Sequence, residues 1–537
     1  MSGEVEGVVR RAREQSIGDL LRRSARRLPN RTAIRCGDTV WSYAQLDALC
    51  NRLGRGLIGL GVAKGDRVAV LARNSHAFVA MRFAIARIGA VLAPINFMLN
   101  PEEIRFILAS SGATILAVGP EFVETGRAAA ATGCAVRGFV WLPGEEPSEP
   151  PADITTFDDL LVADASEPGI AVDGRDLAQI IYTSGTESLP KGAMLTHEAV
   201  MWQYVSCIID GGMADDDLVL HALPLYHCAQ LDVFLGPAIY LGATSVVTAK
   251  PTADSILSLI EAHGVTSFFA PPTVWIGLLR SPAFERTNLS SLRKGYYGAS
   301  IMPVEVLLEL QRRLPQVRLW NFYGQTEIAP LATVLKPEDQ LRKAGSAGRP
   351  ALNVETRVVN AAMEDVSPGE IGEIVHRSPH LLSGYYGAPD KTAAAFAGGW
   401  FHSGDLATVD DEGYVTVVDR LKDMIKTGGE NVASREVEEA IYRLPQVSEV
   451  AVVGLPDPRW IEAVAAVVVV KAGQTLAAEA VIEHCARSMA HFKVPKRVVF
   501  VDHLPRNPSG KLLKRELRQR YARDAPAAEL GAGRSAG

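Results

Sequence analysis

The stretch YTSGTESLPKG, residues 182–192, decides the fold class, because it joins a strand-like run to a loop suited to holding phosphate. The apolar residues 177–181 directly before it are typical of a buried strand. The small residues of the loop are Thr183, Ser184, Gly185, Thr186 and Ser188. Residues of this size let backbone N–H groups come close to a polyphosphate, so the stretch predicts a phosphate site.

Lys191 and Gly192 close this loop. The lysine adds a positive charge beside the phosphate, and the glycine is expected to let the chain turn away. The loop is not of the Walker type, because Pro190 stands where that motif has glycine before the lysine. A polar surface loop is the competing interpretation.

Strand-like and helical runs alternate on both sides of the loop. Residues 67–71 read as a strand before the helical run 77–88, and residues 265–269 read as a strand before the helical run 273–279. Such alternation is typical of α/β layers.

The C-terminal part of the chain changes in character. Residues 372–418 contain many glycines and short strand-like runs. The runs that follow are 435–444 (helical), 450–454 and 463–470 (strands) and 477–490 (helical), which we interpret as a compact βαβ-like stretch. We place a domain junction at residues 420–422, and we expect the Ala/Gly-rich tail, residues 525–537, to be disordered.

Composition narrows the class of protein. The formal net charge is -6 and no basic block is dense enough to follow a phosphate backbone, so we expect no nucleic-acid partner. The six cysteines form no CxxC pair, which fits a reducing cytosol, and the charged residues 1–16 do not resemble a secretory signal. The longest apolar run, near residues 463–470, is too short for a transmembrane segment.

A second motif is NFYGQTE, residues 321–327. Tyr323 can stack on a purine and Thr326 can bond a phosphate oxygen. Glu327 can hold Mg²⁺ through one oxygen, which suits an ion whose other ligands are phosphates. A turn with an exposed glutamate is the competing interpretation.

Three further motifs carry polar groups that suit a nucleotide. In FHSGDL, residues 401–406, Asp405 can accept hydrogen bonds from both hydroxyls of a ribose, although an aspartate in a turn is often structural. In residues 419–438, Arg420 can bond a ribose, Lys426 can reach a phosphate, and Gly428 with Gly429 allows close approach of the backbone, although this charge run is equally typical of a solvated face.

The last motif is PRNPSGK, residues 505–511. Lys511 follows a tight turn at the end of a small domain, from which it can be carried into the site of another domain. An exposed lysine in a loop is the competing interpretation.

In this order and spacing the five motifs resemble the adenylate-forming superfamily of acyl- and aryl-CoA synthetases, adenylation domains of peptide synthetases, and luciferases. The resemblance runs from WSYAQL, residues 41–46, to Lys511. Other marks of the family are GDRV at 65–68, LNPEEI at 99–104 and GEI at 372–374. The resemblance implies an α/β fold with a large multi-layered N-terminal domain (1–419) and a small mobile α+β C-terminal domain (420–524), with the active site between them.

The resemblance also assigns roles to residues. It implies that residues 183–191 are the phosphate loop, that Tyr323 stacks on adenine, that Asp405 and Arg420 bind ribose and that Lys422 is the hinge. The implied nucleotide- and CoA-binding residues are Thr183, Ser184, Gly185, Thr186, Lys191, Gly298, Ala299, Ser300, Asn321, Tyr323, Gly324, Asp405, Arg420, Lys426, Gly428 and Gly429. The implied catalytic residues are Lys511, Thr326, Glu327 and His227, with Glu327 as the metal ligand. One departure is Glu187 and Ser188 where the family has threonine and glycine, and we expect Glu187 to point to solvent because phosphates repel a carboxylate.

The resemblance implies an ATP-dependent acyl-CoA ligase that uses Mg²⁺ and coenzyme A. The segments matched to the acyl pocket are 226–229, Val233, Phe234, 296–300 and 329–331. They are mostly apolar and offer no arginine or lysine, which favours a fatty or aryl monocarboxylic acid. His227 is placed against the carboxylate, with a core histidine as the alternative. Transfer of the acyl group to an amine or a carrier protein, and a non-catalytic nucleotide-binding protein, remain open, as does a homodimer.

Overall fold

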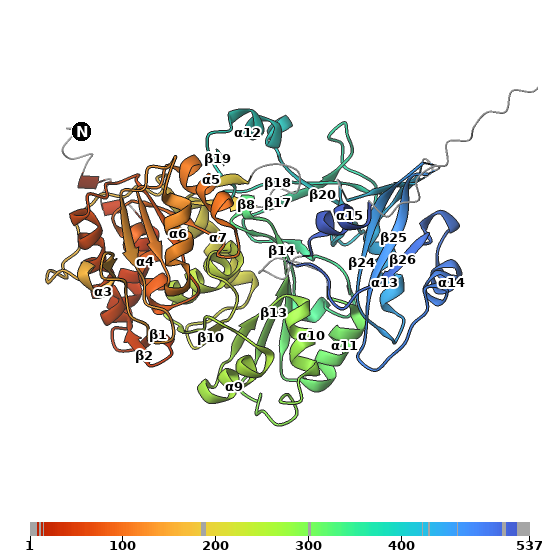
Figure 1. The fold of residues 1–537 in the computed structure, drawn as a ribbon, viewed down its shortest axis with the longest axis horizontal. Helices are drawn as coiled ribbons and strands as arrows, with labels where there is room; N and C mark the ends of the chain where they lie inside the picture. Colours follow the sequence, from red (N-terminus) through yellow and green to blue (C-terminus); the bar gives the residue numbers. More distant parts are fainter. Residues whose placement is uncertain are drawn as a thin grey trace, which may run out of the picture. The chain divides into compact units, whose positions relative to one another are not determined.

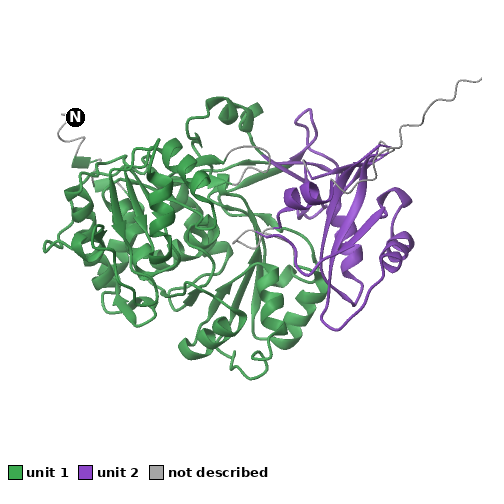
Figure 2. Ribbon diagram, viewed as in Figure 1, with its two compact units in different colours: residues 1–357, 375–402 green, residues 358–374, 403–537 purple. Residues whose placement is uncertain are grey.

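The computed structural model divides by its internal contacts into two compact units (Figure 2). Unit 1 holds Met1–Arg357 and Val375–His402, and unit 2 holds Val358–Ile374 and Ser403–Gly537. The structure describes residues 8–9, 12–13, 15–183, 190–298, 302–421, 423–427, 430–458, 460–506 and 512–522. The tail predicted to be disordered, residues 525–537, lies outside the described residues, as does the predicted hinge Lys422. The boundary at residue 420 stays a prediction.

Unit 1 contains a nine-stranded sheet of described residues (Figure 1). In spatial order its strands are β16 (Arg349–Pro350), β15 (Leu331–Leu335), β14 (Arg318–Gly324), β13 (Lys294–Gly298), β12 (Ser267–Phe269), β10 (Leu218–His221), β11 (Thr244–Val247), β1 (Thr32–Cys36) and β2 (Thr39–Ser42). In this spatial order the strands from β14 to β1 are parallel, and antiparallel pairs close both ends of the sheet.

An eight-stranded sheet is the second scaffold of unit 1. In spatial order it contains β19 (Gly384–Tyr385), β9 (Lys191–Thr196), β8 (Leu177–Thr183), β4 (Val91–Pro94), β3 (Arg67–Leu71), β5 (Ile115–Val118), β6 (Gly138–Trp141) and β7 (Thr155–Thr156). The parallel orders β4-β3-β5-β6 here and β11-β10-β12-β13 in the first sheet match strand for strand. Each sheet therefore has a switch point, where neighbouring connections leave in opposite directions and ligands of α/β proteins often bind.

Helices fill the space between the two sheets and cover their outer faces (Figure 1). The inner layer contains α2 (Ile17–Arg27), α3 (Tyr43–Gly59), α4 (His76–Arg87), α7 (His197–Asp210), the π-helix η3 (Ala229–Leu235) and α8 (Gly236–Leu241). The outer layers contain α5 (Pro101–Ser111), η1 (Pro120–Phe122) and α6 (Val123–Ala130) on the second sheet and α9 (Ala253–His263), α10 (Pro272–Arg280) and α11 (Val304–Arg313) on the first. Short helices in connections are η2 (Asp158–Leu160), η4 (Thr326–Ile328), η5 (Pro337–Asp339), α12 (Pro389–Ala395) and η6 (Ala397–Gly399).

Two of the motifs that mark the family are helix starts. In LNPEEI the Asn100 side chain accepts from the N–H groups of Glu102 and Glu103, and the Glu103 carboxylate accepts from the Asn100 N–H. Ser42 and Gln45 cap α3 in the same reciprocal way. These capping boxes satisfy backbone donors that a helix start leaves unpaired, so the residues are explained by local structure.

Unit 2 is built on a five-stranded sheet of described residues. Its strands are β23 (Glu430–Val432), β22 (Ile425–Thr427), β25 (Ile461–Val470), β24 (Val447–Asp457) and β26 (Arg497–Phe500), packed with α13 (Ser434–Tyr442), α14 (Ala478–Ser488), η7 (His491–Lys493) and α15 (Lys514–Ala522). A four-stranded sheet of β17 (Glu355–Val359), β18 (Gly372–Arg377), β20 (Phe401–Val409) and β21 (Val415–Arg420) is formed where the chain passes between the units. The βαβ-like interpretation was wrong for β24 and β25, which pair directly as an antiparallel hairpin, and the parallel connection is β25-α14-β26.

Ile461 has an unfavourable backbone conformation. It is a β-branched residue with φ of 70°, and its side chain is 70% exposed. A left-handed conformation costs a residue with a Cβ about 1–2 kcal/mol. Glycine avoids this cost, but its greater freedom in the unfolded chain offsets part of the gain in stability. We expect Ile461→Gly to raise the free energy of unfolding by about 0.5–1 kcal/mol in urea titrations. Ile461→Ala keeps the Cβ and should show no gain; an equal gain in both variants would contradict the account.

Three fully buried histidines make the fold sensitive to acid. Burial lowers the pKa of His197, His221 and His376 to about 3, and their Nε2 atoms have no hydrogen-bond partner among the described residues. Since these values lie below the unfolded pKa of about 6.5, the unfolded chain binds protons first as the pH falls. Stability is therefore lost from about pH 6.5 downward, by roughly 4 kcal/mol for three groups at pH 5.5.

Urea unfolding at pH 7.5 and pH 5.5 measures this loss. We expect His376→Asn to reduce the loss of unfolding free energy between pH 7.5 and pH 5.5 by about one third, because one of the three histidines is removed. This holds whatever effect the substitution has on stability at pH 7.5. The exposed His503 serves as the control, because His503→Asn should leave the dependence unchanged. Equal stability of the natural protein at the two pH values would contradict the prediction.

Candidate active site

The predicted phosphate loop connects two paired strands. Thr183 ends β8 and Lys191 begins β9; the two residues are register partners, and the Thr183 hydroxyl donates to the Lys191 carbonyl at 3.4 Å. Ser184, Gly185, Thr186, Glu187 and Ser188 lie outside the described residues. The prediction that the chain turns at Gly192 was wrong, because Gly192 pairs with Tyr182 within β9. The glycine is needed for packing: a Cβ there would lie 2.7 Å from the Ile180 side chain.

The second motif spans the end of β14 and the short helix η4. Asn321 is buried, and its amide donates to the Ser346 carbonyl at 2.9 Å. Gly324 lies so close to the next strand that a Cβ would stand 1.7 Å from the Pro330 carbonyl oxygen. A Cβ on Gly298, on the neighbouring strand β13, would likewise lie too close, 2.4 Å from the Phe322 carbonyl oxygen. The two glycines thus let backbone from adjacent strands meet at the predicted nucleotide site, of which Ala299 and Ser300 lie outside the described residues.

Glu327 is a half-buried carboxylate, and among the described residues its side chain is hydrogen-bonded to a neutral group alone. Its Oε1 accepts a hydrogen bond from the Tyr385 hydroxyl at 3.0 Å. No ion pair to Glu327 is found among the described residues, and no group of three or more acidic, histidine or cysteine side chains gathers there as a metal cluster. A single carboxylate without a cation suits Mg²⁺ that brings phosphate and water oxygens as its other ligands.

His227 follows β10 at the switch point of the nine-stranded sheet. It is half-buried rather than a core residue, and its Nδ1 accepts from the Ala229 N–H at 3.1 Å. The adjacent Cys228 lies with its Sγ 3.4 Å from the Thr326 hydroxyl. The predicted catalytic residues His227 and Thr326 are therefore held on segments in direct contact.

Aromatic side chains gather around Phe234 and Tyr296, two of the residues matched to the acyl pocket. Phe234 and Phe269 stack with their centroids 4.5 Å apart, and Tyr296 stacks on Trp320 at 5.1 Å. The end of α7 anchors this ring cluster, which consists of Phe234, Phe269, Tyr296, Trp320 and Phe322. The Tyr296 hydroxyl donates to the Gly211 carbonyl at 2.8 Å, and the Trp320 indole N–H donates to the Asp210 carbonyl at 3.1 Å.

Unit 2 carries the predicted ribose ligands. Asp405 on β20 and Arg420 on β21 are register partners, and the Arg420 guanidinium lies 3.2 Å from the Asp405 carboxylate. Asp405 is almost buried, whereas Arg420 is one-third exposed. The Lys426 side chain on β22 is exposed, and the Lys426 backbone N–H donates to the Glu462 carboxylate. Gly428, Gly429 and Lys511 lie outside the described residues.

Replacement of Asp405 tests the ribose assignment. Asp405→Asn keeps the shape but removes the charge that two ribose hydroxyls are expected to meet, a loss of about 1.5–3 kcal/mol. We therefore expect ATP affinity, measured by calorimetry, to fall roughly tenfold to hundredfold. Asp411→Asn, at an exposed position in the following turn, is the control. Unchanged ATP affinity in Asp405→Asn would remove Asp405 from the site.

Sequence reasoning missed Tyr385. Its hydroxyl reaches Glu327 and its ring lies 5.0 Å from the Lys191 ammonium, so one side chain touches two predicted site residues. The local sequence, SGYYG at 383–387, gave no signal beyond a turn, because the contacts arise only when β19 pairs with β9.

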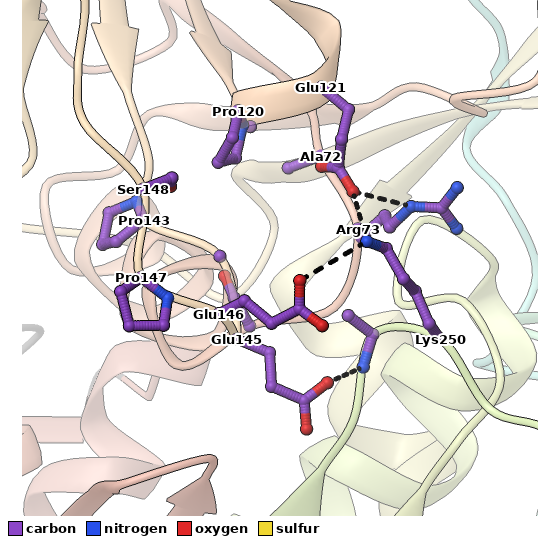
Figure 3. Close-up of a pocket in the computed structure, with 14 residues that line it drawn as sticks. Ala72, Arg73, Pro120, Glu121, Pro143, Glu145, Glu146, Pro147, Ser148 and Lys250 are labelled. Carbon is purple, nitrogen blue, oxygen red and sulfur yellow. Dashed lines mark hydrogen bonds and ion pairs between the residues drawn. The ribbon is translucent and has the colours of Figure 1, made fainter.

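A cavity of about 200 Å³ lies elsewhere in unit 1 (Figure 3). Its walls come from the connections after β3, β5, β6 and β11, and none of the predicted ATP- or acyl-binding residues lines it. Glu121 pairs with both Arg73 and Lys250, and the Glu145 carboxylate accepts from the Ala249 N–H at 2.7 Å. These contacts join the two sheets, so we interpret the charges as structural.

Comparison with known families matches two separate parts of the chain. A family model described as AMP-binding enzyme matches residues 21–386, and a second, described as AMP-binding enzyme C-terminal domain, matches residues 436–511. The described helices include none with the length and hydropathy of a membrane span.

Individual relatives are similar over nearly the whole chain. Feruloyl-CoA synthase of an Amycolatopsis species is 40% identical, over 95% of this chain and 100% of its own. Long-chain-fatty-acid–CoA ligase FadD13 of Mycobacterium tuberculosis is 37% identical, over 95% of this chain and 100% of its own. The crystal structure of the anthranilate CoA ligase AuaEII in complex with anthranoyl-AMP aligns with a TM-score of 0.86 at 27% identity, over 94% of this chain and 97% of that one.

Proposed function

We propose that this chain, which belongs to the family of AMP-binding enzymes and is an AMP-forming acid–thiol ligase, acts on a compact aromatic monocarboxylic acid. The observation that carries the substrate class is the anchored ring cluster around Phe234 and Tyr296. Aromatic rings pack well against another ring. The segments matched to the acyl pocket contain no arginine or lysine that would pair with a second carboxylate of the substrate.

We place the closed end of the acyl site at the same cluster. Hydrogen bonds from Tyr296 and Trp320 fix the rings to the end of α7, and a Cβ on Gly211 would already lie 2.9 Å from the Phe322 ring. A site closed by tightly packed rings accepts a ring with a short side chain more easily than a long alkyl chain. The relative named feruloyl-CoA synthase and the anthranoyl-AMP complex agree with an aromatic acid.

The reaction proceeds in two balanced steps. An oxygen of the substrate carboxylate attacks the α-phosphorus of ATP, the bond to the β-phosphate breaks, and pyrophosphate leaves. The thiol of coenzyme A then loses its proton and attacks the carbonyl carbon, and AMP leaves with the bridging oxygen. Positioning and charge neutralisation are the main catalytic work, since no protein nucleophile takes part.

Residues of this chain have distinct parts in the first step. Lys191 and Thr326 bind phosphate oxygens, Asp405 and Arg420 bind the ribose, and His227 lies against the carboxylate. Glu327 would hold Mg²⁺, which supplies neutralisation of the phosphate charge when bound. Lys511 stabilises the charge that develops on the α-phosphate, and the C-terminal domain rotates at Lys422 between the two steps.

A pyrophosphate-release screen tests the substrate class. Purified protein with ATP, Mg²⁺ and coenzyme A is offered hydroxycinnamic, benzoic and arylacetic acids beside fatty acids of increasing length. We expect the highest kcat/KM for an aromatic acid and a decline with alkyl chain length. The second candidate is a long-chain fatty acid, favoured by the likeness to FadD13, and a maximum at long chain length would replace our proposal.

The acceptor and the compartment are tested separately. Coenzyme A, amino acids and a carrier protein are offered in turn, and the products are identified by mass; an amide or an acylated carrier protein in place of the CoA thioester would show another acceptor. We propose a cytoplasmic location, because all six cysteines are free thiols and five of them are buried.

A further inference from the structure

Tyr385 is held in a fixed place beside β9, the strand that begins with Lys191. It belongs to the short strand β19, where it pairs with Ala193 of β9, two residues after Lys191. The next N–H along the chain, that of Tyr386, donates to the Gly192 carbonyl at 2.8 Å. The backbone of Tyr385 is therefore fixed on the strand that begins with the loop lysine.

The side chain of Tyr385 connects this strand to η4. Its hydroxyl donates to Glu327 Oε1 at 3.0 Å, and the Leu382 N–H donates to the Glu327 carbonyl at 2.8 Å. The face of its ring lies 5.0 Å from the Lys191 ammonium. Tyr385 is buried, so its hydroxyl and ring are held within the packed interior of unit 1.

The two charged groups around Tyr385 do not neutralise each other. Lys191 and Glu327 form no ion pair with any described residue. The electron-rich ring face attracts the ammonium, and the hydroxyl binds the carboxylate at the other end of the same side chain. This arrangement leaves the lysine available for phosphate and the carboxylate available for a cation.

We propose that Tyr385 is a positioning residue of the adenylation step, which orients the Glu327 carboxylate through its hydroxyl and the Lys191 ammonium through its ring. The inference rests on the proposed roles of Glu327 and Lys191 in binding metal and ATP. A group that fixes a metal-binding carboxylate changes metal affinity when it is removed, typically by about 10- to 100-fold. A tyrosine that only fills the core has no such effect.

Direct metal binding distinguishes these roles. Mn²⁺ is titrated into the full-length protein saturated with α,β-methylene-ATP, and free Mn²⁺ is measured by electron paramagnetic resonance. We expect Tyr385→Phe to weaken Mn²⁺ binding roughly tenfold or more. Tyr43→Phe is the matched control, because Tyr43 is buried in the same core and its hydroxyl donates to the Ala243 carbonyl. That control should bind Mn²⁺ as the natural protein does.

Two more variants separate the contributions of the ring and the hydroxyl. Tyr385→Leu removes the ring as well, and we expect it to weaken binding of metal-free nucleotide about fivefold, which Tyr385→Phe should not do. Adding Tyr385→Phe to Glu327→Gln should produce no further loss of Mn²⁺ affinity, because the hydroxyl acts through that carboxylate.

The outcomes separate this inference from the proposed function. If Glu327→Gln weakens Mn²⁺ binding and Tyr385→Phe does not, Tyr385 is only a packing residue and the inference is wrong. If Glu327→Gln leaves Mn²⁺ binding unchanged, the metal role of Glu327 fails first and the inference falls with it. Additive losses in the double variant would also overturn it.

Discussion

Glu327→Gln is expected to slow acyl-AMP formation by about 100- to 1,000-fold, the scale for losing one preorganised charge partner of a transition state. The substitution keeps the size of the side chain and an oxygen for the Tyr385 hydroxyl, but removes the charge that faces the predicted cation. Single-turnover release of pyrophosphate, with acid and Mg²⁺ saturating, measures the effect.

The matched control is Glu338→Gln. Glu338 is an exposed glutamate of the same unit, on η5, in a long contact with Arg318. The Glu338→Gln variant should release pyrophosphate at the natural rate. A loss of less than about tenfold in Glu327→Gln would be too small for a metal ligand in the transition state and would contradict the metal role of Glu327.

Lys511→Ala is expected to separate the two half-reactions. If the lysine serves adenylation alone, acyl-AMP formation should fall about 100-fold or more. The same variant, given synthetic acyl-AMP and coenzyme A, should form thioester at a near-natural rate, because a lysine on a domain that rotates away does not assist both steps. Lys511 lies outside the described residues, so this prediction rests on the motif PRNPSGK and on family membership.

Gly429→Leu supplies the opposite arm of this experiment. A bulky side chain where the backbone is expected to approach the thiol path should impair thioester formation and spare adenylation. Equal damage to both half-reactions in both variants would refute the proposed rotation, although the ligase assignment would stand.

Local elements of the fold could be predicted well from the sequence. The strand predicted at 67–71 is β3, and the helical run 77–88 is α4, His76–Arg87. The two ends of the predicted phosphate loop, Thr183 and Lys191, lie where β8 ends and β9 begins, because small residues after an apolar run are a local signal. The phosphate-binding role stays a prediction. The prediction that Gly192 turns the chain failed because the pairing of β9 with β8 continues through that glycine.

Tertiary relations were not visible in the sequence. Both faces of the hairpin β24–β25 are buried, Val452 and Val464 in one core cluster and Ala451 and Val467 in another, so its strands show no alternation that would reveal their pairing. Tyr385 was missed for a related reason. It stands 58 residues from Glu327 in the chain, and only the pairing of β19 with β9 brings the two together.

Isotope transfer tests the central claim most directly. The enzyme is given an aromatic acid whose carboxylate oxygens are both ¹⁸O, together with unlabelled ATP and coenzyme A, and the products are weighed by mass spectrometry. If the carboxylate attacks the α-phosphorus, AMP carries one ¹⁸O and pyrophosphate carries none. Unlabelled AMP, or formation of ADP with labelled phosphate, would contradict activation through an acyl-adenylate.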